Sequence, residues 1–306
     1  MKSTQKSKAP RNRTLSITDE DICKLTPLIH RSIQKPEGII LGDSFLLTSQ
    51  LPKKCIDLLI LDPPYNLNKT FGKSNFLSRS IQDYQQWIEA YLAEIIPALK
   101  TTASIYVCGD WFSSASLYPA LAKFFKIRNR ITWEREKGRG SKTNWKNCSE
   151  DIWYCTMSDK FKFYPDRVRL RRRVLAPYRD SSGSPKDWKE SQGKRYRDTA
   201  PSNLWSDITI PFWSMSENTN HPTQKPEKLI AKLILSSSDE GDLVFDPFLG
   251  SGTSAVVAKK LKRRYLGFEK EEEYCLYSLK RIMQAAEEDS IQGYHDDVFW
   301  ERNSCI

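Results

Sequence analysis

Hydrophobic residues form short runs that alternate with longer stretches in which apolar positions recur every three or four residues. The short runs predict buried strands and lie at 38–41, 56–61, 104–108, 127–133, 151–156, 242–245 and 264–268. The longer stretches predict helices with one apolar face and lie at 83–99, 112–125, 227–236, 254–262 and 271–286. Strands and helices at this spacing predict an α/β fold, a doubly wound, mostly parallel Rossmann-like sheet.

A glycine-containing turn at 246–253 joins a predicted strand to a predicted helix. We expect its glycines to let the backbone approach a ligand that faces the free N–H groups of the helix. With Glu269 at the end of the next strand, the segment also fits the dinucleotide fingerprint. Asp246 would repel a pyrophosphate, but it suits a ligand with an amine and a sulfonium, such as S-adenosylmethionine. A turn that only packs the helix on the sheet is a further alternative.

A second motif, Asp62-Pro63-Pro64-Tyr65-Asn66, follows the apolar run 56–61. The prolines lack N–H donors, so the carbonyl groups around them can point outward. Asp62 and the next carbonyl could accept two hydrogen bonds from one exocyclic amine, while Tyr65 offers a flat face to the ring. Such geometry suits a flipped-out base. The alternative is a proline-rich strand end with a core tyrosine.

The chain of 306 residues has a formal net charge of +10, which points to a polyanionic partner. Residues 160–198 hold thirteen Lys and Arg but only five Asp and Glu, so much of this charge lies in one short stretch. Few apolar runs occur there, and we expect an irregular, DNA-facing lobe. The candidate DNA contacts are Lys137, Arg139, Lys142, Arg169, Arg171, Arg172, Arg173, Arg195 and Arg197.

Seven cysteines are scattered without Cys-x-x-Cys spacing, and none of the three histidines lies near a cysteine in sequence. We therefore expect no metal site and a reducing compartment. No apolar run approaches the length that spans a membrane, and the first residues lack the hydrophobic segment of a secretory signal. A cytoplasmic location without membrane association is predicted.

Together, Asp62–Tyr65 and 246–253 resemble the motifs of the amino-methylating DNA methyltransferases, and their order is similar to the beta class. The resemblance covers most of residues 38–284. It implies methyl transfer from S-adenosylmethionine to an exocyclic amine of a base in double-stranded DNA. An Asp at the first position and Asn66 after the tyrosine are typical of members that modify adenine N6; cytosine N4 is the alternative.

The resemblance also implies roles for individual residues. Asp62 and the Pro63 carbonyl would bind the target amine, and Tyr65 would stack on the flipped base. Asp43 would bind the cofactor's adenine amine, Asp246 its methionine amine and Glu269 its ribose. The implied catalytic residues are Asp62, Pro63, Pro64 and Tyr65, and the implied cofactor contacts are Asp43, Thr223, Gln224, Lys225, Asp246, Phe248, Gly250, Ser251, Gly252, Thr253 and Glu269. His221 is expected to orient its turn.

The predicted organisation is a flexible basic arm (1–35), a catalytic half (36–158), a target-recognition region (159–220), a cofactor-binding half (221–290) and a tail (291–306). Two other classes stay open: a nicotinamide-dependent oxidoreductase, which leaves the Asp62 motif unexplained, and a noncatalytic DNA-binding protein. A separately acting restriction endonuclease, a solitary regulatory role and a homodimer are all compatible with the sequence.

Overall fold

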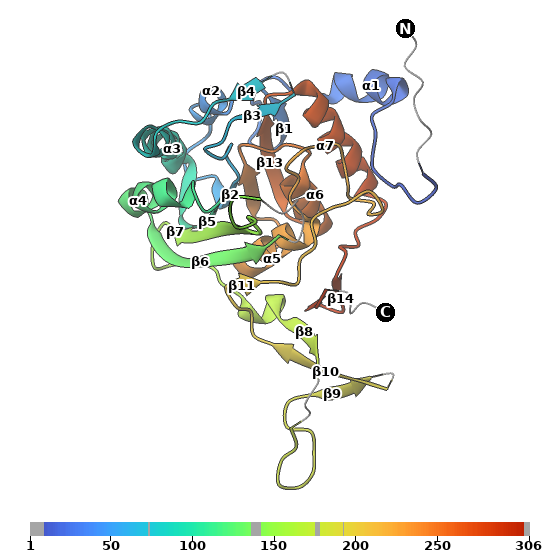
Figure 1. Ribbon diagram of the computed structural model, residues 1–306. Coiled ribbons are helices and arrows are strands. Elements are labelled where there is room, and N and C mark those ends of the chain that lie inside the picture. Colours follow the sequence, from blue (N-terminus) through green and yellow to red (C-terminus); the bar gives the residue numbers. More distant parts are fainter. Residues whose placement is uncertain (1–8, 73, 136–141, 175–177, 192, 303–306) are drawn as a thin grey trace.

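A central sheet of eight strands organises the computed structural model, which describes residues 9–72, 74–135, 142–174, 178–191 and 193–302. The strand order is β1-β13-β12-β2-β5-β7-β6-β11 (Figure 1). The strands are β1 (Gly38–Leu41), β2 (Ile56–Leu61), β5 (Leu99–Gly109), β6 (Lys126–Glu134), β7 (Ser149–Thr156), β11 (Leu204–Trp205), β12 (Leu243–Asp246) and β13 (Arg264–Glu269). Only β7 runs antiparallel to its neighbours. The predicted mostly parallel α/β sheet is confirmed.

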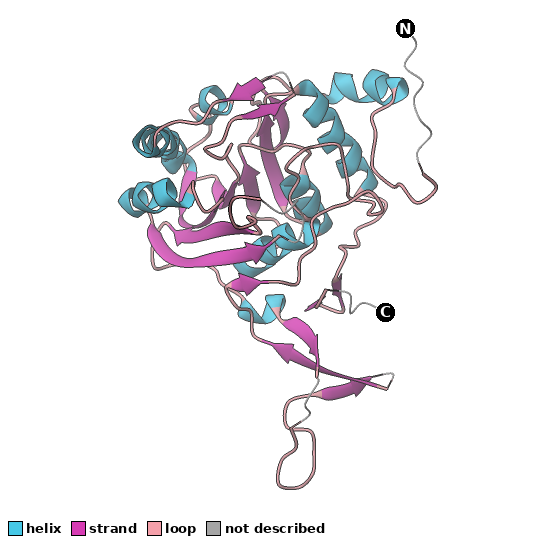
Figure 2. Cartoon of the chain, viewed as in Figure 1, coloured by secondary structure: helices cyan, strands magenta, loops and turns pink. Residues whose placement is uncertain are grey.

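Helices cover both faces of this sheet (Figure 2). They are α2 (Ser44–Thr48), α3 (Ile81–Ile95), α4 (Ser114–Phe124), α5 (Glu227–Ser237), α6 (Thr253–Lys260) and α7 (Glu272–Gln284). Side chains of β2 alternate between the two layers: Leu59 and Leu61 pack with α3 and α4, whereas Leu58 and Ile60 pack with α5. Burial on both faces explains why this strand is apolar at every position except Asp57.

The first predicted helix ends earlier than its apolar pattern. Helix α3 stops at Ile95, the turn Ile96–Ala98 follows, and β5 begins at Leu99. Pro97 lies in that turn and has no N–H for a further helical hydrogen bond, so it stops the helix. As a result β5 is longer than the predicted run 104–108.

The basic lobe contains a second sheet, so the prediction of an irregular lobe is wrong. Its order is β14-β15-β8-β10-β9, with β8 (Leu170–Arg173), β9 (Lys189–Ser191), β10 (Lys194–Thr199), β14 (Tyr294–His295) and β15 (Val298–Trp300). The strands were missed because they are short and charged. The predicted tail contributes β15, which pairs with β8, while Trp300 packs on Tyr196. This sheet projects away from the central one (Figure 1).

The N-terminal arm is folded where the structure describes it. Helix α1 (Asp19–Leu25) begins with a capping box at Thr18, and the Asp21 carboxylate pairs with Lys280 of α7 at 2.6 Å. Leu25 is buried. This part of the arm therefore differs from the predicted flexible segment, while 1–8 lies outside the described residues. Within the described chain, each helix is too short or too polar to cross a bilayer.

Candidate active site

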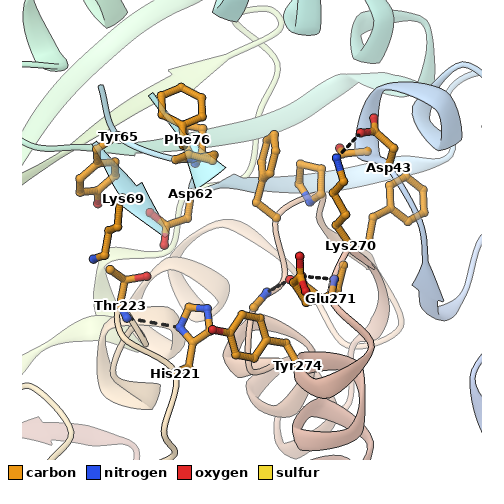
Figure 3. Close-up of a pocket in the computed structure, with 18 of the residues that line it drawn as sticks. Asp43, Asp62, Tyr65, Lys69, Phe76, His221, Thr223, Lys270, Glu271 and Tyr274 are labelled. Carbon is orange, nitrogen blue, oxygen red and sulfur yellow. Dashed lines mark hydrogen bonds and ion pairs between the residues drawn. The ribbon is translucent and has the colours of Figure 1, made fainter. Parts of the chain in front are cut away.

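A cavity of about 340 Å³ lies where β1, β2 and β13 end. Ligands of open α/β sheets bind at the carboxyl ends of the strands. The side chains of Asp62 and Tyr65 lie on one side of this cavity, and Asp43 and Lys270 lie on the other (Figure 3). The structure thus brings both sequence motifs and the end of β1 to one place.

The Asp62 carboxylate directly follows β2 and is paired inside the protein. The Lys225 ammonium lies 2.8 Å from Oδ1 and 2.7 Å from Oδ2 of Asp62. Burial raises the pKa of Asp62, and the charge of Lys225 opposes this rise. The pairing therefore favours the carboxylate form, which can accept hydrogen bonds but not donate them.

Lys225, an implied cofactor contact, lines the cavity and lies against the Asp62 motif. Its ammonium is also 3.1 Å from the Tyr65 hydroxyl and 3.4 Å from Glu150 Oε2. Burial alone would lower the pKa of Lys225, but the charges of Asp62 and Glu150 raise it above its usual value. Lys225 belongs to the catalytic motif's surroundings and carries a permanent charge there.

The rest of the Asp62 motif is held by hydrogen bonds. The Tyr65 hydroxyl donates to Glu150 Oε2 at 3.0 Å, and the Pro64 carbonyl accepts from the Tyr84 hydroxyl at 3.0 Å. Pro63 lines the cavity. Asn66 is buried, and its side chain binds both the N–H and the carbonyl of Arg79. Asn66 thus fixes the backbone at Arg79, which also lines the cavity, and is not positioned to contact a base.

An aromatic wall of Phe45, Trp87 and Phe248 lines the cavity, and the buried Tyr91 packs against it. The Phe248 ring lies 6.2 Å from that of Trp87 and 5.4 Å from that of Tyr91, between ring centroids. Phe45 joins them, and the Arg79 guanidinium lies over Trp87 at 5.5 Å. Trp87 lies in the predicted helix 83–99, where its spacing matches that of any packed apolar face. The wall is shaped for a flat, apolar ligand group.

Asp43 and Glu269, two of the three carboxyl groups predicted to bind the cofactor, line this cavity. Asp43 Oδ1 accepts from the Phe45 N–H at 3.0 Å and so caps α2, while Oδ2 is 3.3 Å from Lys270. Glu269 accepts the N–H groups of Gly250 and Glu271 at 2.7 and 2.8 Å. Burial raises the pKa of Glu269 to about 7.

Asp246 lies deeper, in a smaller cavity that Asp62, Thr223 and Lys225 also line. Its carboxyl group accepts hydrogen bonds from Ser254 Oγ at 2.6 Å and from the Phe248 N–H at 3.0 Å. Burial raises the pKa of Asp246 to about 7. A cation brought to this point would favour the ionised form.

The glycines of the turn also serve packing, and Gly250 lines the cavity as well. Gly250 has φ +56°, and a Cβ there would lie 2.9 Å from His221 Nε2. Gly252 has φ +86°, and a Cβ there would lie 2.6 Å from Ser278 Oγ. Ser251 and Thr253 are held by Arg281, which donates to the Ser251 carbonyl and Thr253 Oγ1.

The segment around His221 meets the expectations in part. Thr223 lines the cavity, and its N–H points at His221 Nδ1 at 3.4 Å. Burial lowers the pKa of His221 to about 3, so the neutral ring can orient this turn as predicted. The Gln224 side chain instead folds back, accepts from Thr219 and donates to the Glu217 carbonyl. Gln224 lines the smaller cavity beside Asp246 and not the main one, and its contact with the cofactor stays a prediction.

Most predicted DNA contacts in the lobe have carboxylate partners. Arg171 binds Asp198 through two hydrogen bonds of 2.7 Å across the strand pair, so it stabilises the lobe's sheet. The other ion pairs are Arg169–Asp166, Arg172–Glu301, Arg195–Glu190 and Arg197–Asp187. Arg173 and Lys142 are exposed, whereas Lys137 and Arg139 lie outside the described residues.

Glu150 was missed at the sequence level. It lies at the start of β7, is 5% exposed, and pairs with Arg135 at 2.6 Å besides its contacts with Tyr65 and Lys225. Its only signal in the sequence is a carboxylate at the entrance of an apolar strand.

Comparison with known proteins adds to this geometry. The family model described as DNA methylase (N6_N4_Mtase) matches residues 56–280. The chain belongs to this DNA methylase family. The match spans both motifs and the lobe between them. Family membership removes the oxidoreductase and the noncatalytic DNA-binding protein from consideration.

Relatives of this DNA methylase are similar over most of its length. It is 31% identical over 252 residues to the DNA adenine methyltransferase YhdJ of Escherichia coli K12, which covers 80% of this chain and 82% of that protein. It is 30% identical over 249 residues to the type II methyltransferase M.HpaI of Haemophilus parainfluenzae, and this match covers 80% of this chain and 74% of that protein. The solved cytosine-N4-specific PvuII DNA methyltransferase has a TM-score of 0.60 at 18% identity, covering 85% and 92%, and shares the fold.

Proposed function

We propose that this DNA methylase transfers a methyl group from S-adenosylmethionine to the N6 amine of a flipped-out adenine in double-stranded DNA. The observation that carries the proposal is the common cavity: Asp62 and Tyr65 line the same space as the aromatic wall and Glu269. A base and a cofactor held there would meet. The name of the E. coli relative, a DNA adenine methyltransferase, supports adenine as the target.

The described residues fit S-adenosylmethionine. The aromatic wall with Phe248 suits the adenine ring, and Asp43 and Glu269 offer carboxyl oxygens to an amine and to hydroxyl groups. Asp246 receives its hydrogen bonds from neutral donors, which leaves its charge to be balanced by a cationic amine. Bound there, the cofactor would supply an electrophilic methyl group.

On the base side, this chain's residues would prepare the amine. The lone pair of an exocyclic amine is conjugated with its ring, so the amine is a poor nucleophile. Hydrogen bonds from its two protons to Asp62 and the Pro63 carbonyl localise that lone pair. The Tyr65 ring holds the base by stacking, and much of the rate comes from the proximity of the two reactants.

The lobe of 159–220 would select the DNA sequence, since its exposed basic residues can contact phosphates and base edges. Among the predicted contacts that the structure describes, Arg169, Arg173 and Arg195 of the lobe are exposed, as is Lys142 before β7. We further propose a role in restriction and modification, with a separately acting endonuclease, because M.HpaI is named a type II methyltransferase. Methylation in the cytoplasm by a homodimer is also compatible with this proposal.

The test is to incubate the protein with S-adenosylmethionine and unmethylated DNA of mixed sequence, digest the DNA to nucleosides and identify methylated bases by mass spectrometry. N6-methyladenine is the expected product. N4-methylcytosine would keep the mechanism and overturn the target base. DNA without either base, from protein that binds the cofactor, would refute the proposed function.

A further inference from the structure

Four side chains of alternating charge form a series of ion pairs that ends at Asp62. Arg135 NH1 lies 2.6 Å from Glu150 Oε1, and Glu150 Oε2 lies 3.4 Å from Lys225 Nζ. Lys225 in turn contacts both oxygens of Asp62. Glu150 does not line the main cavity, so it can act on a substrate only through its neighbours.

The hydrogen atoms of Lys225 and of the Tyr65 hydroxyl each have an acceptor. The Lys225 ammonium has three, and its neighbours accept them: Asp62 Oδ1, Asp62 Oδ2 and the Tyr65 oxygen at 3.1 Å. The Tyr65 hydroxyl then donates its own hydrogen to Glu150. The orientation of the Tyr65 hydroxyl and the position of the ammonium thus depend on the same Glu150 oxygen.

A buried Glu at this place is poorly explained by stability. Its charge repels Asp62 and contributes to the raised pKa of that carboxyl. A neutral acceptor could hold the Tyr65 hydroxyl without this repulsion, because taking another charge out of water is unfavourable. The Glu150 charge does, however, share in balancing the Lys225 ammonium, which lies 3.4 Å from Glu150 Oε2.

We propose that Glu150 is a positioning residue for methyl transfer: it fixes the Tyr65 ring through its hydroxyl and shares the Lys225 ammonium, so that Asp62 keeps accepting capacity for the target amine. The inference rests on the proposed function. Without Glu150, the full charge of Lys225 would act on Asp62 and make it a weaker acceptor. The Tyr65 ring would also lose the bond that sets its tilt.

The test compares Glu150→Gln with wild type in the full chain, by steady-state methylation of DNA across pH. The amide still offers an oxygen to the Tyr65 hydroxyl but removes the charge. We expect kcat to fall about 10- to 100-fold, as for other displaced catalytic groups, with the Kd for S-adenosylmethionine unchanged within about threefold. The matched control is Glu89→Gln on α3. It removes a carboxylate that pairs with Lys123 at 2.6 Å, and it should leave kcat unchanged.

The acid limb of the kcat profile supplies a readout that a purely structural role would not move. Removing the Glu150 charge should lower the pKa of Asp62, so the limb should shift to lower pH. The other titratable groups that face this carboxyl are common to both proteins: Tyr65, Lys69, Tyr84, Cys108, Lys225 and Asp246.

Tyr65→Phe provides a second variant. It keeps the ring and the Glu150 charge but removes the hydroxyl that bonds to Glu150 and Lys225. We therefore expect a smaller loss of kcat than in Glu150→Gln and little movement of the acid limb. Suppose that wild type methylates DNA. A Glu150→Gln variant that is equally active, or whose acid limb does not move, then refutes this inference but not the proposed function. A wild type that methylates no DNA refutes the proposed function and this inference with it. If Glu150→Gln does not fold, a Tyr65→Phe protein with wild-type kcat decides against it.

Discussion

The affinity of this DNA methylase for S-adenosylmethionine should depend on pH through Asp246. Burial raises the pKa of this carboxyl to about 7, so below that pH the free protein holds it protonated and neutral. A cationic amine favours the ionised form, and binding must then release a proton. Affinity should therefore weaken as the pH falls through 7 and level off above it.

The magnitude follows from the ionised fraction. With a pKa of about 7, the carboxyl group is about 90% ionised at pH 8 and about 10% ionised at pH 6. If only the carboxylate binds the amine, Kd should rise about tenfold between pH 8 and pH 6, which is about 1.4 kcal/mol. Glu269, whose pKa burial also raises to about 7, faces neutral hydroxyl groups in the proposed complex and should contribute little.

Isothermal titration calorimetry at several pH values measures this dependence. Asp246→Asn should bind more weakly at pH 8 and lose the slope, whereas Glu269→Gln, the matched control, should keep it. S-adenosylhomocysteine carries the amine without the sulfonium, so its Kd should show the same slope. A Kd that is constant from pH 6 to pH 8 in wild type, or an equal slope in Asp246→Asn, would refute the reasoning.

Three further outcomes are expected. Asp62→Asn should abolish methyl transfer in the nucleoside assay while cofactor binding stays within about threefold, because the amide cannot bind the amine as a carboxylate does; retained activity would contradict the assignment. Gly252→Ala should lower the free energy of unfolding by about 2–4 kcal/mol in urea titrations, because its Cβ would lie 2.6 Å from Ser278 Oγ. The control Gly183→Ala has a similar φ of +81° but open space, and should cost only about 1 kcal/mol. Leu59→Ala, wholly buried between α3 and α4, should cost about 2–5 kcal/mol, and a change below 1 kcal/mol would count against the described core.

Much of the central domain could be predicted from the sequence because its signals are local. The run 56–61 is apolar at nearly every position, and the structure buries all of it. Asp62 follows that strand directly, so its place at the carboxyl edge of the sheet follows from the strand itself. The same reasoning places Glu269 at the end of β13.

Other features depend on contacts between distant parts of the chain. Glu150 meets Tyr65 across 85 positions, and no spacing rule links a strand entrance to that hydroxyl. The turn glycines face His221 and Ser278, and neither neighbour can be read from the turn's own sequence. The lobe's sheet was hidden because pairs such as Arg171 and Asp198 neutralise each other across strands that look merely charged.

The two buried carboxylates near the centre of the site differ in what balances their charge. Asp62 is balanced within the protein by Lys225, so it is kept ionised and ready to accept hydrogen bonds from a neutral amine. Asp246 is held by a hydroxyl and an amide N–H, which stabilise its charge only in part and leave the pKa of its carboxyl raised. A cationic amine therefore gains more by binding beside Asp246, and a neutral amine is better accommodated beside Asp62. This difference in internal partners would assign the cofactor's amine to the side of Asp246 and the base to the side of Asp62 before either has bound.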